Sequence, residues 1–134
     1  MVKYIDNDVH DLILELLTKY FDDKSAIFII SDHGAHLPGI DNILFSQQKN
    51  IENFLGVFIM ILPNNSNLNM EIIHHNEQVL VTPLDFYFTL LDMIKIKRSK
   101  LHHSKLGESV FIKLKRKNRN CKSLNIPMNY CKCK

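Results

Sequence analysis

The N-terminal third of the chain combines a helical pattern of apolar residues with a continuous apolar run. Apolar side chains recur at helical spacing over roughly residues 7–21, and Asp6, Asn7 and Asp8 precede them as possible caps, so this segment is predicted to be a helix. A polar turn at residues 22–25 leads into the apolar residues 26–30, which are typical of a buried strand. The helical positions are Val9, Leu12, Ile13, Leu16, Leu17 and Tyr20.

The later pattern predicts a second strand and a second helix. Residues 55–62 form another apolar run, closed by Pro63, and residues 64–69 read as a loop. Thr82, Pro83 and Asp85 form a helix start with a cap, a proline at the first helical position and an acidic side chain three residues after the cap. We expect this helix to run to about Lys97, with Leu84, Phe88, Leu91 and Ile94 facing a core and Tyr87 beside them. Residues 110–114 look strand-like.

The first strand ends abruptly in polar residues that suit a metal site. Ser31, Asp32 and His33 follow the apolar run, which places them at the carboxyl edge of a sheet, where open α/β folds hold ligands. Gly34 gives the backbone freedom for the carboxylate and the imidazole to reach one cation. Oxygen and nitrogen donors together favour zinc or manganese over calcium. The alternative is structural: Asp32 caps a turn and His33 is an ordinary loop residue.

The net charge of +3 hides a strong asymmetry along the chain. Residues 1–94 hold 4 Lys/Arg and 13 Asp/Glu, whereas residues 95–134 hold 13 Lys/Arg and 1 acidic residue. A basic tail of this kind can bind nucleic acid or an anionic surface, but it lacks the regularly spaced aromatic residues of a stacking platform. A solvated tail is the favoured interpretation.

The three cysteines all fall near the C-terminus. In an oxidising compartment, Cys121 is expected to pair with Cys131 or Cys133, leaving one thiol over. A zinc site that combines the Cys-x-Cys ending with His102 and His103 has suitable atoms but lacks the paired spacing of structural zinc sites. Asn64 begins a formal glycosylation acceptor, which weakly favours a secreted ancestry.

The length of the chain and the length of its apolar runs limit the number of domains and the possibility of a membrane span. A chain of 134 residues can bury one core, and it offers no apolar run long enough to span a bilayer. The first residues show no secretory signal, which taken alone favours a cytosolic chain.

Sequence blocks along nearly the whole chain occur in the order that one animal protein family has them. They read FIISDHGAHLPG, IENFLGVFIMILP, NEQVLVTPLDFYFTLLDMI, GESVF and NRNCKSLNIPMNYCKC. In these blocks the chain resembles the domain of unknown function family 229, a secreted or membrane-anchored branch of the alkaline phosphatase and sulfatase superfamily. The resemblance implies an α/β fold, the C-terminal part of an alkaline phosphatase-like sheet sandwiched by helices. It divides the chain into a partial domain at residues 1–114 and a basic, cysteine-containing tail at residues 115–134.

The resemblance also implies residue roles. Asp32 and His33 match the adjacent Asp and His that ligate one of two metals. Asp6 and His10 have the spacing of the second-site pair, but they lie on the helix that leads into the strand, so we do not assign them to that site. The family usually has Arg where His36 stands and Pro where Gly56 stands. Sequence alone does not single out the late metal ligand among His36, His74, His75, His102 and His103.

By the same resemblance, the nucleophile and the remaining ligands should lie upstream of Met1. We therefore expect the C-terminal portion of an extracellular or secretory-pathway hydrolase of small or glycan-like phosphate or sulfate esters, which binds zinc or manganese weakly and is inactive alone. The alternatives are a non-catalytic remnant that serves in interactions and, less favoured, a basic nucleic-acid binder; we expect no specific nucleic-acid partner.

Overall fold

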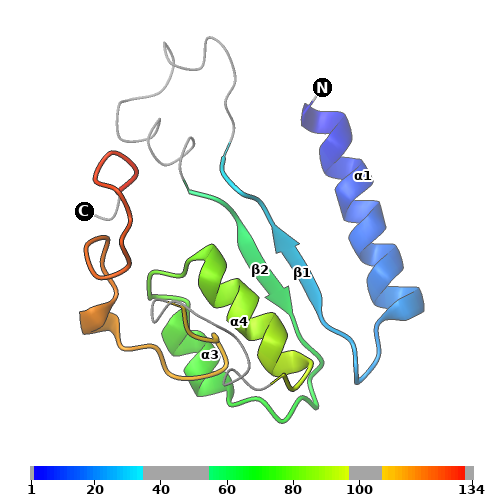
Figure 1. Ribbon diagram of the computed structural model, residues 1–134. Coiled ribbons are helices and arrows are strands. Elements are labelled where there is room, and N and C mark those ends of the chain that lie inside the picture. The colour runs from blue at the N-terminus through cyan, green and yellow to red at the C-terminus, as the bar shows by residue number, and fades with distance from the viewer. Residues whose placement is uncertain (1, 35–54, 97–106, 132–134) are drawn as a thin grey trace. The chain divides into compact units, whose positions relative to one another are not determined.

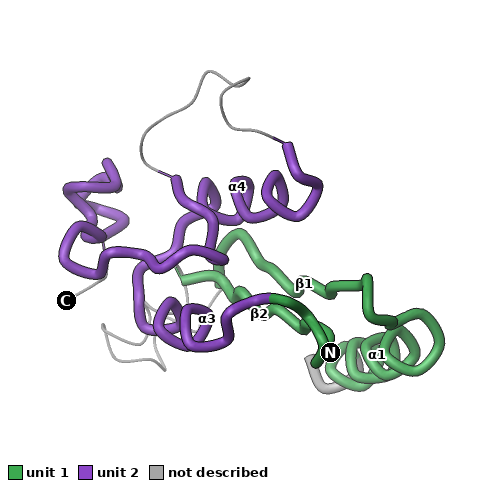
Figure 2. The backbone as a smooth tube through the Cα atoms, turned by 90° about the horizontal axis from the view of Figure 1, so that it is seen from below, with its two compact units in different colours: residues 1–67 green, residues 68–134 purple. Residues whose placement is uncertain are grey.

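The chain is divided into two compact units, residues 1–67 and residues 68–134 (Figure 2). The computed structural model describes residues 2–34, 55–96 and 107–131. Helices and a small antiparallel sheet share these residues, which fits the α/β class. None of the helices in the described ranges has the length and apolar character needed to cross a membrane.

The first unit begins with the predicted helix, which starts earlier than expected. Helix α1 spans Val2–Glu15 and continues as a π-helical segment, η1, at Leu16–Tyr20 (Figure 1). At the junction, the Thr18 hydroxyl donates a hydrogen bond to the Leu14 carbonyl oxygen (2.7 Å). The apolar side chains of this helix are largely exposed, Ile5, Val9, Leu12 and Tyr20 among them. The amphipathic pattern therefore predicted the helix correctly, although none of the side chains described from Ile5 to Tyr20 is buried.

A hydrogen-bonded turn connects the helix to the sheet. The Ser25 hydroxyl and the Lys24 amide donate hydrogen bonds to Asp22 Oδ1, at 2.5 and 3.0 Å. These bonds, the one from Ser25 first, hold the pKa of the Asp22 carboxyl below its usual value. The turn therefore favours the ionised form of Asp22, and strand β1, Ile27–Ile30, begins two residues beyond Ser25.

Both predicted strands are present, and they pair with each other. Strand β1 lies antiparallel to strand β2, Phe58–Ile61, in a two-stranded sheet (Figure 1). Ile27 pairs with Ile61 and Ile30 with Phe58. Strands of purely apolar residues are typical of sheets covered on both faces, yet Ile30 and Ile59 are about half exposed in this unit.

The second unit contains one predicted helix and one that the sequence pattern did not reveal. Helix α3, Met70–Asn76, starts at Asn69, whose side-chain oxygen accepts a hydrogen bond from the Glu71 amide (3.0 Å). Helix α4 spans Pro83–Met93 and has the predicted capping box between Thr82 and Asp85. It ends before the predicted Lys97, because Lys95 adopts a positive φ of 57° that helical backbone does not allow.

The core-facing side of α4 differs in part from the prediction. Phe88 and Leu91 are buried as expected, whereas Leu84, Tyr87 and Ile94 are exposed. The other buried positions of this helix are polar, Asp85 and Thr89. This unit is therefore organised around polar side chains as much as around apolar ones.

The prediction of a strand at residues 110–114 is wrong. The segment is a turn followed by irregular chain, because a side chain takes the place of a partner strand. The Asn76 amide nitrogen donates to the carbonyl oxygens of Val110 and Ile112, both at 2.8 Å, and its oxygen accepts from the Leu114 amide at 3.0 Å. A short 3-10 helix, Arg116–Asn118, follows.

We predict that Asn76→Ala lowers the free energy of unfolding by about 3 kcal/mol, because it leaves several buried backbone groups without partners. Urea titration measures the change. His74→Ala on the same helix is the matched control, since His74 is exposed and pairs with Glu77 on the surface; it should shift the unfolding free energy by less than about 0.5 kcal/mol. Equal effects of the two substitutions would contradict the role assigned to Asn76.

Candidate functional site

Asp32 and His33 lie just beyond the end of β1 and face each other. Asp32 Oδ2 is 3.6 Å from His33 Nε2. The side chains are 88% and 49% exposed, respectively, so both are accessible to a ligand from solvent. The structure thus brings together the carboxylate and the imidazole that the sequence singled out.

Local hydrogen bonds orient both groups. Asp32 Oδ1 accepts from the His33 backbone amide at 3.0 Å, which turns Oδ2 toward the imidazole. His33 Nδ1 lies 2.6 Å from the Gly34 carbonyl oxygen. A carbonyl oxygen can only accept, so Nδ1 must carry the hydrogen, and Nε2 is the unprotonated nitrogen of the neutral ring. When the ring is protonated, Nε2–H instead forms an ion pair with Asp32.

The turn that carries this pair is anchored to the segment before β2. The Ser31 amide donates to the Val57 carbonyl oxygen (3.0 Å), and the Val57 amide donates to Ser31 Oγ (2.7 Å). Gly56 makes this close approach possible, since a Cβ there would lie 2.3 Å from the Ser31 carbonyl oxygen. The proline expected at this position by resemblance would require the backbone to move.

The other histidines that the structure describes make contacts of their own. His75 Nε2 donates to the Leu114 carbonyl oxygen (3.0 Å), and His74 Nδ1 lies 3.2 Å from a Glu77 carboxylate oxygen. His10 Nδ1 contacts Asp11 Oδ1 (3.0 Å) on α1. His36, His102 and His103 lie outside the described residues. Among residues 2–34, 55–96 and 107–131, no three or more His, Cys, Asp or Glu side chains gather into a metal-binding group.

A buried charged cluster in the second unit was not predicted from the sequence. Asp85 is fully buried and accepts hydrogen bonds from the Thr82 amide (2.7 Å), the Thr82 hydroxyl (2.8 Å) and the Glu108 amide (2.7 Å). It also forms an ion pair with the buried Arg119 guanidinium, whose Nε donates to the Leu80 carbonyl oxygen (2.8 Å). The cluster is closed to solvent and its groups bond within the fold, so its role is structural.

Arg119 therefore departs from the expectation of a solvated basic tail. Residues 115–131 belong to the same compact unit as residues 68–114. The sequence contained both partners in specific blocks: Asp85 in the Thr-Pro-Leu-Asp helix start and Arg119 two residues before Cys121. Nothing in the sequence showed that the two side chains meet. The division of the chain at residue 114 stays a prediction.

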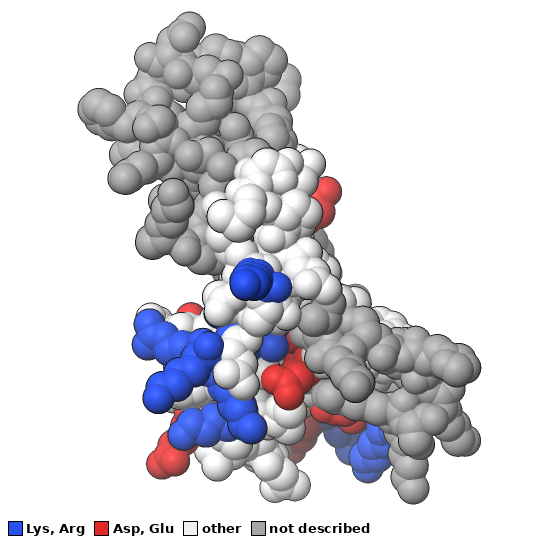
Figure 3. All heavy atoms as spheres, turned by 60° about the vertical axis from the view of Figure 1, so that its left-hand side comes forward, with Lys and Arg blue, Asp and Glu red and all other residues white. Residues whose placement is uncertain are grey.

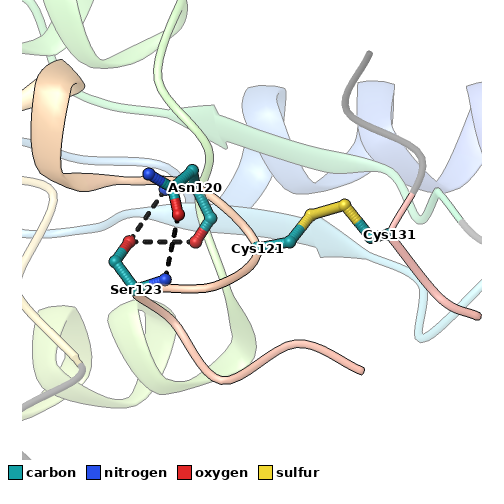
Figure 4. Close-up of a disulfide and its surroundings, with 4 residues drawn as sticks. All are labelled: Asn120, Cys121, Ser123 and Cys131. Atoms are coloured by element: carbon teal, nitrogen blue, oxygen red, sulfur yellow. Dashed lines mark hydrogen bonds between the residues drawn. A yellow bond between two sulfur atoms is a disulfide. The ribbon is translucent and has the colours of Figure 1, made fainter. Parts of the chain in front are cut away.

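Cys121 and Cys131 form a disulfide, one of the two pairings expected (Figure 4). Their Cα atoms are 5.8 Å apart. Cys121 is buried and lies two residues after Arg119 in the chain. The disulfide and the Asp85–Arg119 ion pair therefore hold the same segment. Cys133 lies outside the described residues.

One family matches the whole chain. Its description is "Protein of unknown function (DUF229)", and the match covers residues 1–134. The chain belongs to the DUF229 family. No curated protein and no solved structure matches the chain. The matched family is the one that the sequence blocks indicated. The family description assigns no activity to the Asp32–His33 pair.

We predict that Gly56→Ala disturbs the Asp32–His33 turn, because the added methyl group meets the backbone oxygen of Ser31. Overpacking of this kind costs about 1–3 kcal/mol. Amide chemical shifts of residues 31–33 should change in NMR spectra, while the exposed Leu55→Ala leaves them unchanged. Unaltered shifts in Gly56→Ala would show that the strand end accommodates a side chain.

Proposed function

We propose that Asp32 and His33 supply two ligands to a divalent cation in a DUF229 domain that hydrolyses phosphate or sulfate esters. The observation that supports this most directly is the pair's geometry: Asp32 Oδ2 and His33 Nε2 face each other at 3.6 Å at the end of an apolar strand. The proposal includes an alkaline phosphatase-like sheet sandwiched by helices for the complete domain, of which β1 would be one strand.

The two donor atoms fit one metal ion. Zinc binds carboxylate oxygen and imidazole nitrogen at about 2.0–2.2 Å, so two ligands of the same ion lie within about 4 Å of each other. The distance of 3.6 Å between Asp32 Oδ2 and His33 Nε2 falls inside that limit. The hydrogen bond from Nδ1 to the Gly34 carbonyl oxygen is the kind of contact that fixes a metal-binding histidine with Nε2 as the donor.

The number of ligands in the Asp32–His33 pair limits the chemistry that it can support. A bound divalent cation polarises an ester oxygen and lowers the pKa of a bound water. A catalytic zinc generally keeps three protein ligands, and Asp32 and His33 supply two. This chain would therefore bind zinc or manganese weakly, with Asp32 and His33 holding the ion.

Two hydroxyl groups that could have served as nucleophiles have structural roles. Ser31 Oγ accepts a hydrogen bond from the Val57 amide, and the Thr82 hydroxyl donates to the buried Asp85 carboxylate. Ser46 lies outside the described residues. These contacts favour a chain that contributes to a site without performing the reaction alone, and they also support the alternative of a non-catalytic member of the family. The Cys121–Cys131 disulfide supports an extracellular or secretory-pathway location for either.

We predict that the chain binds Zn²⁺ weakly through this pair. His33→Ala and Asp32→Ala should each weaken Zn²⁺ binding by about tenfold or more. Removal of a residue that only orients a metal ligand already weakens binding by about 10–100-fold, so the loss of a ligand itself should cost at least that much. Isothermal titration calorimetry measures the affinity. Ring ¹⁵N shifts of His33 on Zn²⁺ addition identify Nε2 as the ligand independently of affinity.

The matched control is His10→Ala. His10 also contacts a neighbouring carboxylate, Asp11, but through Nδ1 and on the exposed surface of a helix. This variant should bind Zn²⁺ as the unchanged chain does. An equal loss of affinity in His10→Ala and His33→Ala, or no change at the His33 ring, would show that the metal site is elsewhere.

We also predict no turnover of aryl phosphate or aryl sulfate by this chain, with either zinc or manganese added. Two ligands hold the ion too loosely. Ser31 Oγ accepts from the Val57 amide and the Thr82 hydroxyl donates to the Asp85 carboxylate, so both side chains are oriented by contacts within the fold. A spectrophotometric assay of released phenol checks this. Hydrolysis that Asp32→Ala abolishes would contradict the prediction and would locate a complete catalytic centre within the chain.

A further inference from the structure

Residues 113–122, which we call the basic loop, display a group of exposed cations. The side chains of these cations are exposed to solvent, and Figure 3 shows lysine and arginine side chains gathered on one face of the molecule. None of these exposed cations forms an ion pair with a carboxylate of the described residues. The loop contains no Asp or Glu, so its positive charge is not balanced from within. The exposed cations are Lys113, Lys115, Arg116, Lys117 and Lys122.

The backbone of the basic loop is fixed by side chains that point inward. Leu114 and Arg119 are buried, and Arg119 is bonded to both Asp85 and the Leu80 carbonyl oxygen. Between these two anchors, the Asn118 amide donates to the Lys115 carbonyl oxygen (2.9 Å), closing a turn. Lysines on either side of Leu114 are therefore held outward by the burial of the residue between them.

The other end of the loop is held by a covalent bond and by a polar turn. Cys121 is bridged to Cys131, and Asn120 and Ser123 bond each other reciprocally: the Asn120 amide donates to Ser123 Oγ (3.0 Å) and the Ser123 amide to Asn120 Oδ1 (2.9 Å) (Figure 4). A binding surface whose backbone is already ordered loses less entropy when a partner docks. The cations are thus presented by a preorganised loop rather than by a solvated tail.

We propose that the basic loop is a docking surface for a sulfated polysaccharide. A closely spaced row of unpaired cations fits a polyanion, whose bound counterions are released as the cations replace them. A disulfide that holds the loop places it in an oxidising compartment, where the abundant polyanions are sulfated glycans rather than nucleic acids. The basic loop also contains no aromatic side chain on which a nucleic-acid base could stack.

The test compares two triple variants of the full chain that each remove three positive charges. Lys115→Gln/Arg116→Gln/Lys117→Gln neutralises the centre of the basic loop. Lys19→Gln/Lys24→Gln/Lys95→Gln is the control of equal charge change, since those side chains are also exposed but lie outside the basic loop; Lys19, unlike the loop cations, pairs with Glu15 (2.9 Å). The probe is a size-defined heparin oligosaccharide, and its affinity is measured by calorimetry over a range of salt concentrations.

The loop variant should bind heparin about tenfold or more weaker at physiological salt, whereas the control keeps most of the affinity. The slope of log K against the logarithm of salt concentration should also be shallower by about two to three in the loop variant. An unchanged urea midpoint and an intact Cys121–Cys131 bridge establish that the loop variant is folded. Because exposed side chains alone are changed, both variants should meet this condition.

Three further probes decide the class of partner. A desulfated heparin oligosaccharide and hyaluronan should bind much more weakly than the sulfated one, and a single-stranded oligonucleotide of equal charge should bind no tighter. Equal losses in the two triple variants would overturn the proposal, because net charge alone would then explain binding. Tighter binding of the oligonucleotide would overturn the assignment to sulfated glycans and restore the nucleic-acid alternative.

Discussion

The buried ion pair between Asp85 and Arg119 is the contact on which the second unit depends. An isolated charge is very costly to remove from water, and breaking such a pair by deleting one partner typically costs about 3–5 kcal/mol. Asp85, at the start of α4, also accepts from the Glu108 amide, and Arg119 also bonds the Leu80 carbonyl oxygen. One pair therefore fixes the positions of three separate chain segments, including the one that carries the disulfide.

The same unit uses neutral side chains in the same way. Asn76 bonds three backbone groups of residues 110–114, and the Thr89 hydroxyl accepts from the Val110 amide while donating to the Asp85 carbonyl oxygen. A small unit buries few apolar side chains, so irregular segments need partners for their backbone groups. No buried side-chain nitrogen or oxygen of the described residues lacks a partner. The polar network is therefore complete, which is the condition under which it stabilises and specifies a single fold.

Local signals in the sequence predicted what local physics controls. The apolar periodicity and the capping box predicted α1 and α4, and the switch from apolar to polar residues at Ser31 located the Asp32–His33 pair. The strand expected at residues 110–114 failed because its backbone bonds go to Asn76, which is 34 residues or more away in the chain. The burial of Arg119 could not be predicted for the same reason. The composition indicated a solvated basic tail, whereas Arg119 is buried because it pairs with Asp85, which is distant in the chain.

The Asp32–His33 pair contrasts with the buried network in how it is held. Its orientation depends on bonds within residues 31–34 and on the contact with Val57, next to a two-stranded sheet, and a sheet of that size is marginal in water by itself. Under the proposed metal binding, two locally held ligands would bind a cation weakly until further ligands joined them. A cation that bound the folded turn better than the unfolded chain would also stabilise the folded state, so metal binding would be thermodynamically linked to the folding of the first unit.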